Sequence, residues 1–307
     1  MDSGAAIQTK GLSKHYGNVA AVDGVSLRVE RGEIYAFLGL NGAGKTTTIR
    51  MLLGMVRPTA GEACVLGQTI GGRGKKAWES VGYLVETPHA YPELTVRENL
   101  DAVRRLRPGV PAAAVGAIIE RLGLGTYADR RAGTLSLGNV QRLGLAKAML
   151  HNPALLILDE PANGLDPAGI VEIRHFLREL AEEQGVTIFL SSHILGEVAR
   201  IAQRIGIIHQ GRLIEEMDAA ALERNRRRRL VVRTRDEQGG MAALTGAGYH
   251  ARKDGDLLEI TDAGAIERPD EVAAKLVAGG PPPPPPPPGP PPKGESSFWA
   301  GGGGGGG

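Results

Sequence analysis

The most constraining feature of this 307-residue chain is a glycine-rich stretch, Gly39–Thr47. Its letters, GLNGAGKTT, satisfy the phosphate-binding pattern G-x-x-x-x-G-K-[ST]. An apolar run with strand character, residues 34–38, precedes it, and a helix-like segment, residues 46–53, follows. This order directs backbone N–H groups and the positive end of a helix dipole at phosphate oxygens, and glycine permits their close approach. Lys45 then supplies a charge for the β- and γ-phosphates, and the Thr46 hydroxyl can ligate Mg²⁺. The sequence therefore predicts a nucleoside triphosphate site, in preference to a tight turn with an incidental lysine.

Polar residues follow two further apolar runs. Residues 154–158 end in Asp159 and Glu160, and a second run, Val186 to Leu190, leads to His193. Ligands of open α/β sheets bind beyond the carboxyl ends of the strands, so these side chains are expected at one crevice. Asp159 suits Mg²⁺ ligation, Glu160 suits a base that orients or deprotonates water, and His193 suits a γ-phosphate contact. Alone, an acidic loop or a strand-end histidine is more often structural, but the phosphate loop makes the functional interpretation the better one.

Helix-like segments interrupt the strand pattern in the middle of the chain. Residues 7–38 alternate apolar and polar positions, which is typical of strands and hairpins. Further on, Thr95–Glu98 has the capping-box pattern that opens an amphipathic helix, and residues 115–122 and 139–150 are two more helix-like segments. We therefore expect an α/β fold over residues 5–216. It has a P-loop NTPase core sheet, an N-terminal antiparallel β subdomain and an inserted helical lobe at about residues 87–150.

The remainder of the chain has a different character. Residues 217–279 contain two strand-like runs and a helix that starts Pro-Asp-Glu, which predicts a small C-terminal α+β appendage. The arginine run 226–229 is interpreted as solvated surface at a domain junction, with contact to anionic lipid or nucleic acid as a minor alternative. Residues 280–307 contain a proline-rich run at 281–292 and a glycine run at 301–307, and they are expected to be a disordered tail.

Composition excludes several classes of function. The 36 basic and 34 acidic residues nearly cancel, so no general affinity for polyanions is implied. A single cysteine, Cys64, rules out an internal disulfide framework and fits a reducing compartment. No basic-then-apolar leader opens the chain, and no apolar run approaches the ~18 residues needed to cross a bilayer. We therefore expect any membrane function to depend on a partner.

A second motif completes the set. Residues 135–142, LSLGNVQR, are similar to the signature L-S-G-G-Q-x-Q-R of ABC transporter ATP-binding subunits, and they precede Asp159 as in that family. With the phosphate loop and the acidic strand end, this ordered set resembles such a subunit over residues 5–216. The resemblance implies an ATPase whose hydrolysis of ATP is coupled to transport across a membrane.

The resemblance also implies roles for individual residues. Tyr16, which alone is more often a packing residue, matches the aromatic that stacks on adenine. Asp166 closes a stretch that matches the D-loop, and His193 matches the switch histidine. In the family, Ser136 and Gly138 of one subunit complete the site of the other. The residues that match the Walker A loop are Gly39, Asn41, Gly42, Gly44, Lys45, Thr46 and Thr47, and those that match the Walker B pair are Asp159 and Glu160.

The family's assembly is carried over as an expectation. One phosphate loop and one signature in the chain imply that ATP, with Mg²⁺, is hydrolysed by a head-to-tail dimer of two copies. The helical lobe is expected to contact a membrane-spanning permease subunit, which places the protein at the cytoplasmic face of the plasma membrane. No nucleic-acid partner is expected.

Two departures from the family pattern affect these expectations. Glu86 stands where the family has the Q-loop glutamine, and its carboxylate can still reach Mg²⁺ or the attacking water while adding negative charge near the γ-phosphate. The variant Glu-Thr-Pro at residues 86–88 resembles the branch of bacitracin-resistance ATPases, which favours export of a drug, antibiotic or lipid. In the signature, Leu137 and Asn139 replace a glycine and a glutamine.

Two other classes of function stay open at this point. A soluble ABC-type ATPase that acts on the ribosome or DNA is less favoured, because such proteins generally carry two cassettes or a long coiled-coil insertion. A regulator that binds ATP without turning it over is the third possibility, motivated by Glu86 and the unusual tail.

Overall fold

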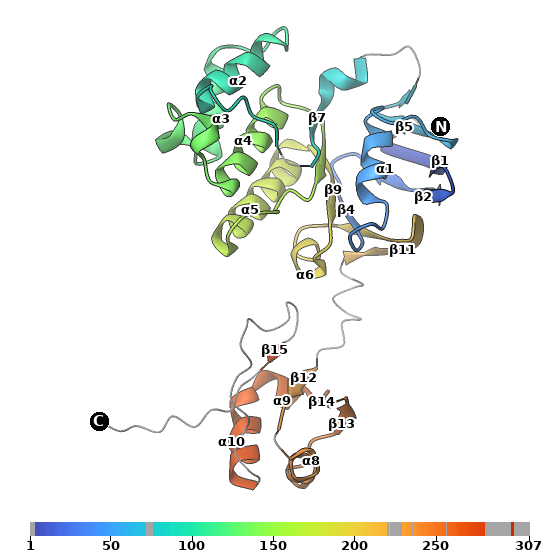
Figure 1. The fold of residues 1–307 in the computed structure, drawn as a ribbon, viewed down its shortest axis with the longest axis vertical. Coiled ribbons are helices and arrows are strands. Elements are labelled where there is room, and N and C mark those ends of the chain that lie inside the picture. The colour runs from blue at the N-terminus through green and yellow to red at the C-terminus, as the bar shows by residue number, and fades with distance from the viewer. Residues whose placement is uncertain are drawn as a thin grey trace. The chain divides into compact units, whose positions relative to one another are not determined.

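The computed structural model contains two compact units, Met1–Glu223 and Arg224–Gly307 (Figure 1). The structure describes residues 4–71, 76–86, 88–219, 221, 229–234, 236–255, 257–279 and 296–297. Residues 226–228 of the arginine run lie outside this set, as does the predicted tail, 280–307, except for Ser296–Ser297. Within the described residues, no helix combines the length and apolar character needed to cross a membrane.

A six-stranded sheet forms the centre of the first unit. Its order is β11-β10-β4-β9-β8-β7, and all neighbours are parallel except β10 and β11. The strands are β4 (Ile34–Leu38), β7 (Val81–Leu84), β8 (Leu155–Asp159), β9 (Thr187–Ser192), β10 (Arg204–His209) and β11 (Arg212–Asp218). Since β4 lies between β9 and β10, the phosphate loop that follows it emerges among strands from much later in the chain.

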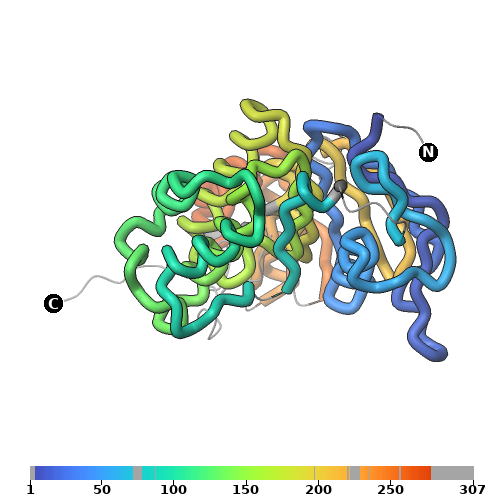
Figure 2. The backbone as a smooth tube through the Cα atoms, turned by 90° about the horizontal axis from the view of Figure 1, so that it is seen from above, coloured from blue at the N-terminus to red at the C-terminus, as the bar shows by residue number. Residues whose placement is uncertain are grey.

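Both faces of this sheet are buried, which explains its apolar strands. On β4, Ile34 and Leu38 belong to one hydrophobic cluster, which contains residues of the helical lobe. Tyr35 and Phe37 alternate with them and belong to a second cluster on the opposite face. Phe189 of β9 stacks on Tyr35 with ring centroids 5.6 Å apart. Figure 2 shows the lobe, in green, and the amino-terminal strands, in blue, on opposite sides of this unit.

The second face is covered by helix α1 and an antiparallel sheet. Helix α1 (Lys45–Leu52) buries Ile49, Met51 and Leu52 in the second cluster. The sheet has the order β2-β1-β5-β6, with β3 also paired to β1. Its strands are β1 (Ala5–Tyr16), β2 (Val19–Val25), β3 (Arg28–Glu30), β5 (Ala60–Val65) and β6 (Gln68–Thr69).

The other face carries the helices between β7 and β10. They are α2 (Val96–Arg105), α3 (Ala113–Arg121), α4 (Leu137–Met149), α5 (Pro167–Gln184) and α6 (Leu195–Val198). The predicted capping box at Thr95 is confirmed: the Thr95 side chain accepts from Glu98 N, and the Glu98 carboxylate accepts from Thr95 N. Helix α4 begins at Leu137, two residues before its predicted start, because the Ser136 side chain caps it by accepting from Asn139 N.

The second unit is a small α+β domain with its own core. Its sheet has the order β13-β14-β12-β15. Its elements are β12 (Leu230–Val232), α8 (Glu237–Gly246), β13 (Ala251–Asp254), β14 (Leu257–Ile260), α9 (Ala263–Glu267), α10 (Pro269–Gly279) and β15 (Ser296–Ser297). Leu230, Leu258 and Leu276 meet in the core. Helix α8 was not predicted, because its glycines and small residues give a weak helical pattern. The predicted α/β fold class, with its appendage, is confirmed.

Candidate functional site

The phosphate loop joins the carboxyl end of β4 to α1 in a conformation that requires glycine. Gly42 and Gly44 have φ of +81° and +108°. A Cβ on Gly44 would lie 2.5 Å from Ala21 O, and one on Gly39 would lie 2.6 Å from Ile208 O. Side chains would therefore collide with neighbouring backbone at both positions.

The start of α1 is open to an anion. Its N-cap, Gly44, makes no side-chain hydrogen bond, and α1 has no acidic residue in its first turn. The first backbone N–H groups of a helix have no partner within the helix, and the helix dipole favours negative charge there. Lys45 lies at the same point, where its Nζ donates to Gly39 O at 2.7 Å and to Leu40 O at 3.2 Å. These donors match a chain of phosphate oxygens.

A cavity of about 230 Å³ lies over this loop. Its lining combines the loop with one residue of β2 and one that follows β8: Ala21, Asn41, Gly42, Gly44, Lys45, Thr46, Thr47 and Glu160. The cavity thus unites the loop with one of the two acidic residues predicted to face it.

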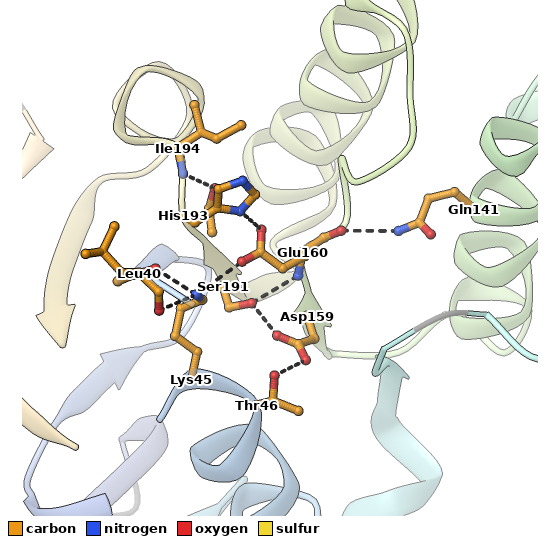
Figure 3. A network of polar contacts seen from close by, with 11 residues as sticks. Leu40, Lys45, Thr46, Gln141, Asp159, Glu160, Ser191, His193 and Ile194 are labelled. Atoms are coloured by element: carbon orange, nitrogen blue, oxygen red, sulfur yellow. Dashed lines mark hydrogen bonds and ion pairs between the residues drawn. The ribbon is translucent and has the colours of Figure 1, made fainter. Parts of the chain in front are cut away.

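The end of β8 is fixed by a hydrogen-bond network (Figure 3). The Thr46 hydroxyl donates to Asp159 Oδ2 at 2.7 Å, and the Ser191 hydroxyl donates to Asp159 Oδ1 at 2.5 Å. The same Ser191 Oγ accepts from Glu160 N at 3.0 Å. Both carboxylate oxygens of the buried Asp159 are therefore engaged, one by α1 and the other by β9.

The Glu160 carboxylate lies between two cationic or proton-carrying side chains. Its Oε2 is 2.9 Å from His193 Nδ1, and its Oε1 is 3.3 Å from Lys45 Nζ. Oε1 is buried and, despite this ion pair, accepts no hydrogen bond within the described residues. The backbone of Glu160 has φ of +49°, and its carbonyl accepts from Gln141 Nε2 at 3.3 Å. The unusual backbone conformation of Glu160 is thus held from both sides, by Ser191 at its N–H and by Gln141 at its carbonyl.

The side chains beside the loop fit a magnesium ion. The described residues contain no group of three or more His, Cys, Asp or Glu side chains that could hold a metal. Mg²⁺ that accompanies nucleotides needs no such group, because it takes one or two protein oxygens and completes its shell with phosphates and water. The adjacent Thr46 hydroxyl and Asp159 carboxylate supply that kind of donor set.

Several expected site residues lie outside this cavity lining: Gly39, Asp159 and His193 stand next to residues that do line it, whereas Tyr16 and Glu86 are placed differently. Tyr16 is 49% exposed, and Lys14 Nζ lies 5.0 Å from the centre of its ring. The ring is thus available on the surface for stacking. Glu86 is not among the lining residues either: its carboxylate pairs with Arg50 of α1, and its backbone has φ of +59°.

The signature and D-loop residues are also absent from the lining of the chain's own cavity. Ser136 caps α4, and the Asp166 side chain caps α5 by accepting from Gly169 N at 2.9 Å. Leu137, which replaces a family glycine, packs against Gly164 of the D-loop: a Cβ on Gly164 would lie 2.5 Å from Leu137 Cδ2. Signature and D-loop therefore touch each other within one subunit.

Two residues of the network had no predicted role. Ser191 bridges Asp159 and Glu160, and Gln141 Nε2 also donates to Pro161 O at 3.0 Å. The sequence placed Ser191 directly after an apolar run, which is a signal for the carboxyl edge of the sheet. Gln141 belongs to the signature motif, residues 135–142, but that motif does not indicate that its side chain reaches the backbone after β8.

Comparison with known proteins gives the family. Residues 22–163 match the family that is described as "ABC transporter". The bacitracin transport ATP-binding protein BcrA of Bacillus licheniformis is 44% identical over 238 residues, which is 78% of this chain and 78% of that protein. The lantibiotic transport ATP-binding protein SrtF of Streptococcus pyogenes is 37% identical over 212 residues, or 69% of this chain and 90% of that one.

A solved structure has the same fold. It is a dimeric, post-hydrolysis state of an ATP-binding cassette bound to ADP and phosphate, with a TM-score of 0.65 and 22% identity, and it covers 69% of this chain and 98% of that one. The first unit has the fold of this cassette, and the similarity to BcrA extends over 78% of the chain. This chain belongs to the ATP-binding, ATP-hydrolysing subunits of ABC transporters.

Proposed function

We propose that the cavity over the phosphate loop binds ATP with Mg²⁺ and that Glu160 is the general base of hydrolysis. The observation that carries this proposal is that the Glu160 carboxylate contacts both Lys45, at 3.3 Å, and His193, at 2.9 Å, beside the loop. Glu160 also lines the cavity, so its carboxylate is close to the space that the nucleotide and the attacking water would occupy.

Each side chain then has a distinct part in the reaction. Lys45 and the first turn of α1 hold the β- and γ-phosphates, while Thr46 and Asp159 hold the ion. Glu160 accepts a proton from the water that attacks the γ-phosphorus, and His193 orients the Glu160 carboxylate and contacts the γ-phosphate. Held by Thr46 and Asp159, Mg²⁺ would supply positive charge that offsets the negative charge developing on the phosphates.

The proposed active form is a head-to-tail dimer. Ser136, Gly138 and Asp166 lie away from the chain's own cavity, which supports a role for them at the cavity of a second copy. The exposed Leu137 beside them gives this surface an apolar contact residue. The dimeric state of the cassette with the same fold is consistent with this arrangement.

The proposed partner is a membrane-spanning permease, and the proposed direction is export. This rests on similarity to subunits named for bacitracin and lantibiotic transport, which also favours a transporter over a soluble ATPase acting on the ribosome or DNA. The cargo class supported by those names is a peptide antibiotic. The chain would then act at the cytoplasmic face of the plasma membrane, attached through the permease.

The first test is the variant Glu160→Gln. We expect at least a ~10²-fold loss of ATP turnover with ATP binding retained, because the amide keeps the shape but cannot take the proton. Glu179→Gln is the control, since this surface glutamate pairs with Arg121 away from the cavity. Near-normal turnover by Glu160→Gln would remove the base assignment.

The same variant tests the assembly. Tagged Glu160→Gln is incubated with ATP and Mg²⁺ in detergent-solubilised membranes, recovered, and its co-purifying proteins are identified. A multi-span membrane protein in near-equal amount is the expected result. Recovery of ribosomal or nucleic-acid material instead would replace the transporter proposal with a soluble ATPase. The dimer is tested separately by sedimentation of the purified variant, and the absence of dimers in the presence of ATP would refute the head-to-tail arrangement.

A further inference from the structure

Glu86 and Glu160 leave the sheet as neighbours. Strands β7 and β8 are parallel, with Leu84 opposite Leu158, and Glu86 and Glu160 each follow this pair by two residues, beyond the same edge of the sheet. The backbones of both glutamates are left-handed, with φ of +59° and +49°. Adjacent strands are about 4.8 Å apart, so a second glutamate starts from the same edge of the sheet as the proposed base.

Arg50 is the partner that the structure gives to Glu86. It lies in the last turn of α1, and its guanidinium forms an ion pair and a hydrogen bond with the Glu86 carboxylate. Arg50 comes four residues after Thr46, and residues with this spacing share one face of a helix. Thr46 donates to Asp159 from that face. The ion pair is therefore on the side of α1 that carries the proposed magnesium site.

The Arg50–Glu86 ion pair affects the balance of charge beyond the ends of β7 and β8. Asp159, Glu160 and Glu86 are three carboxylates, and the cations that contact them are Lys45 and Arg50. A further anion, the terminal phosphate of ATP, has to enter beside them. Without Arg50, the charge of the Glu86 carboxylate would be uncompensated and would repel the phosphate from outside the cavity lining.

We infer that Arg50 is a positioning residue that neutralises Glu86 and so permits a glutamate beside the γ-phosphate of ATP. This inference rests on the proposed function of the cavity. It goes beyond that function because it assigns Arg50 a role and makes residues 50 and 86 a functional pair. A surface ion pair without this role would contribute only slightly to stability and would leave the affinity for ATP unchanged.

The test is a charge cycle of three variants in the Glu160→Gln background, with the Kd of MgATP as the readout. Arg50→Gln leaves Glu86 unpaired and should weaken binding by about 3- to 10-fold at low salt. Glu86→Gln removes a negative charge and should tighten binding by a similar factor. The double variant should return to the starting Kd, and the differences should nearly vanish in 1 M salt, where the screening length is about 3 Å.

A structural role would give a different pattern. If the double variant bound ATP as weakly as Arg50→Gln, charge compensation would be refuted, and thermal melting of each protein would show whether folding is the cause. The matched control is Arg105→Gln, an exposed arginine on α2 that pairs with Asp101. An Arg50→Gln protein that behaves like this control would also overturn the inference. The assignment of Glu160 as the base is tested by a different result: it is wrong if the Glu160→Gln protein keeps its rate of ATP turnover.

Discussion

Replacing Ser191 by alanine tests how the acidic edge is held together. The hydroxyl donates to Asp159 Oδ1 at 2.5 Å and accepts from Glu160 N at 3.0 Å, and the side chain is fully buried. Its loss removes a hydrogen bond to a charged group and leaves a buried N–H without an acceptor, which together cost about 2–4 kcal/mol. For a unit of this size the melting temperature should fall by roughly 5–12 °C.

The same change should lower activity more than the stability loss explains. Glu160 would lose one of the two contacts that hold its backbone, and a displaced base costs at least about 10-fold in kcat. The control is Thr187→Ala at the opposite end of β9, where a buried hydroxyl accepts from Gly32 N at 2.9 Å. Calorimetry gives the melting temperature of each variant. Phosphate release, measured at a temperature where both variants are folded, gives kcat. If both variants melt early and both keep kcat, Ser191 does not position the acidic pair.

Three further predictions concern other parts of the chain. Lys45→Ala should weaken ATP binding by ~10²-fold or more, because a charged partner of the phosphates is lost, and binding of a fluorescent ATP analogue measures it. Gly164→Ala should destabilise the chain by about 1–3 kcal/mol, since φ is +77° and the new Cβ would meet Leu137, and part of the loss should disappear in a Leu137→Ala background in denaturant titrations. In NMR titrations the pKa of His250 should lie above 6.5, because Asp262 hydrogen-bonds it, and Asp262→Asn should lower it. The stability that this pair adds through His250 is present below pH 6.5 and is lost as pH rises through the raised pKa.

The sequence predicted the parts of the site whose geometry is local. Glycines of positive φ, a lysine and the turn into α1 are encoded within nine consecutive positions, Gly39–Thr47, so the loop could be anticipated without a structure. Asp159 and Glu160 could be placed because a continuous apolar run indicates a buried parallel strand. The roles of these side chains stay predictions until the variants are measured.

The rest depends on which distant segments become neighbours. That Arg50 faces Glu86 follows from α1 lying near the end of β7, and no pattern in either segment shows it. Gln141 and Ser191 likewise acquire their roles only when α4 and β9 approach the end of β8. The start of α4 was misjudged because Ser136 was interpreted through the signature motif and not as a helix cap.

The order of strands in the central sheet also has a consequence for how the protein folds. The first strand of this sheet to be synthesised, β4, pairs within the described residues only with β9 and β10, and the hydrogen bond from Gly32 N to Thr187 joins residues 155 positions apart. Such non-local pairing makes folding slow, because the entropy cost of closing a long loop arises before the contacts that offset this cost can form. During synthesis the phosphate loop is therefore exposed long before its acidic partners exist. ATP, which would stabilise only the completed site, should speed no early step but should slow unfolding of the finished unit.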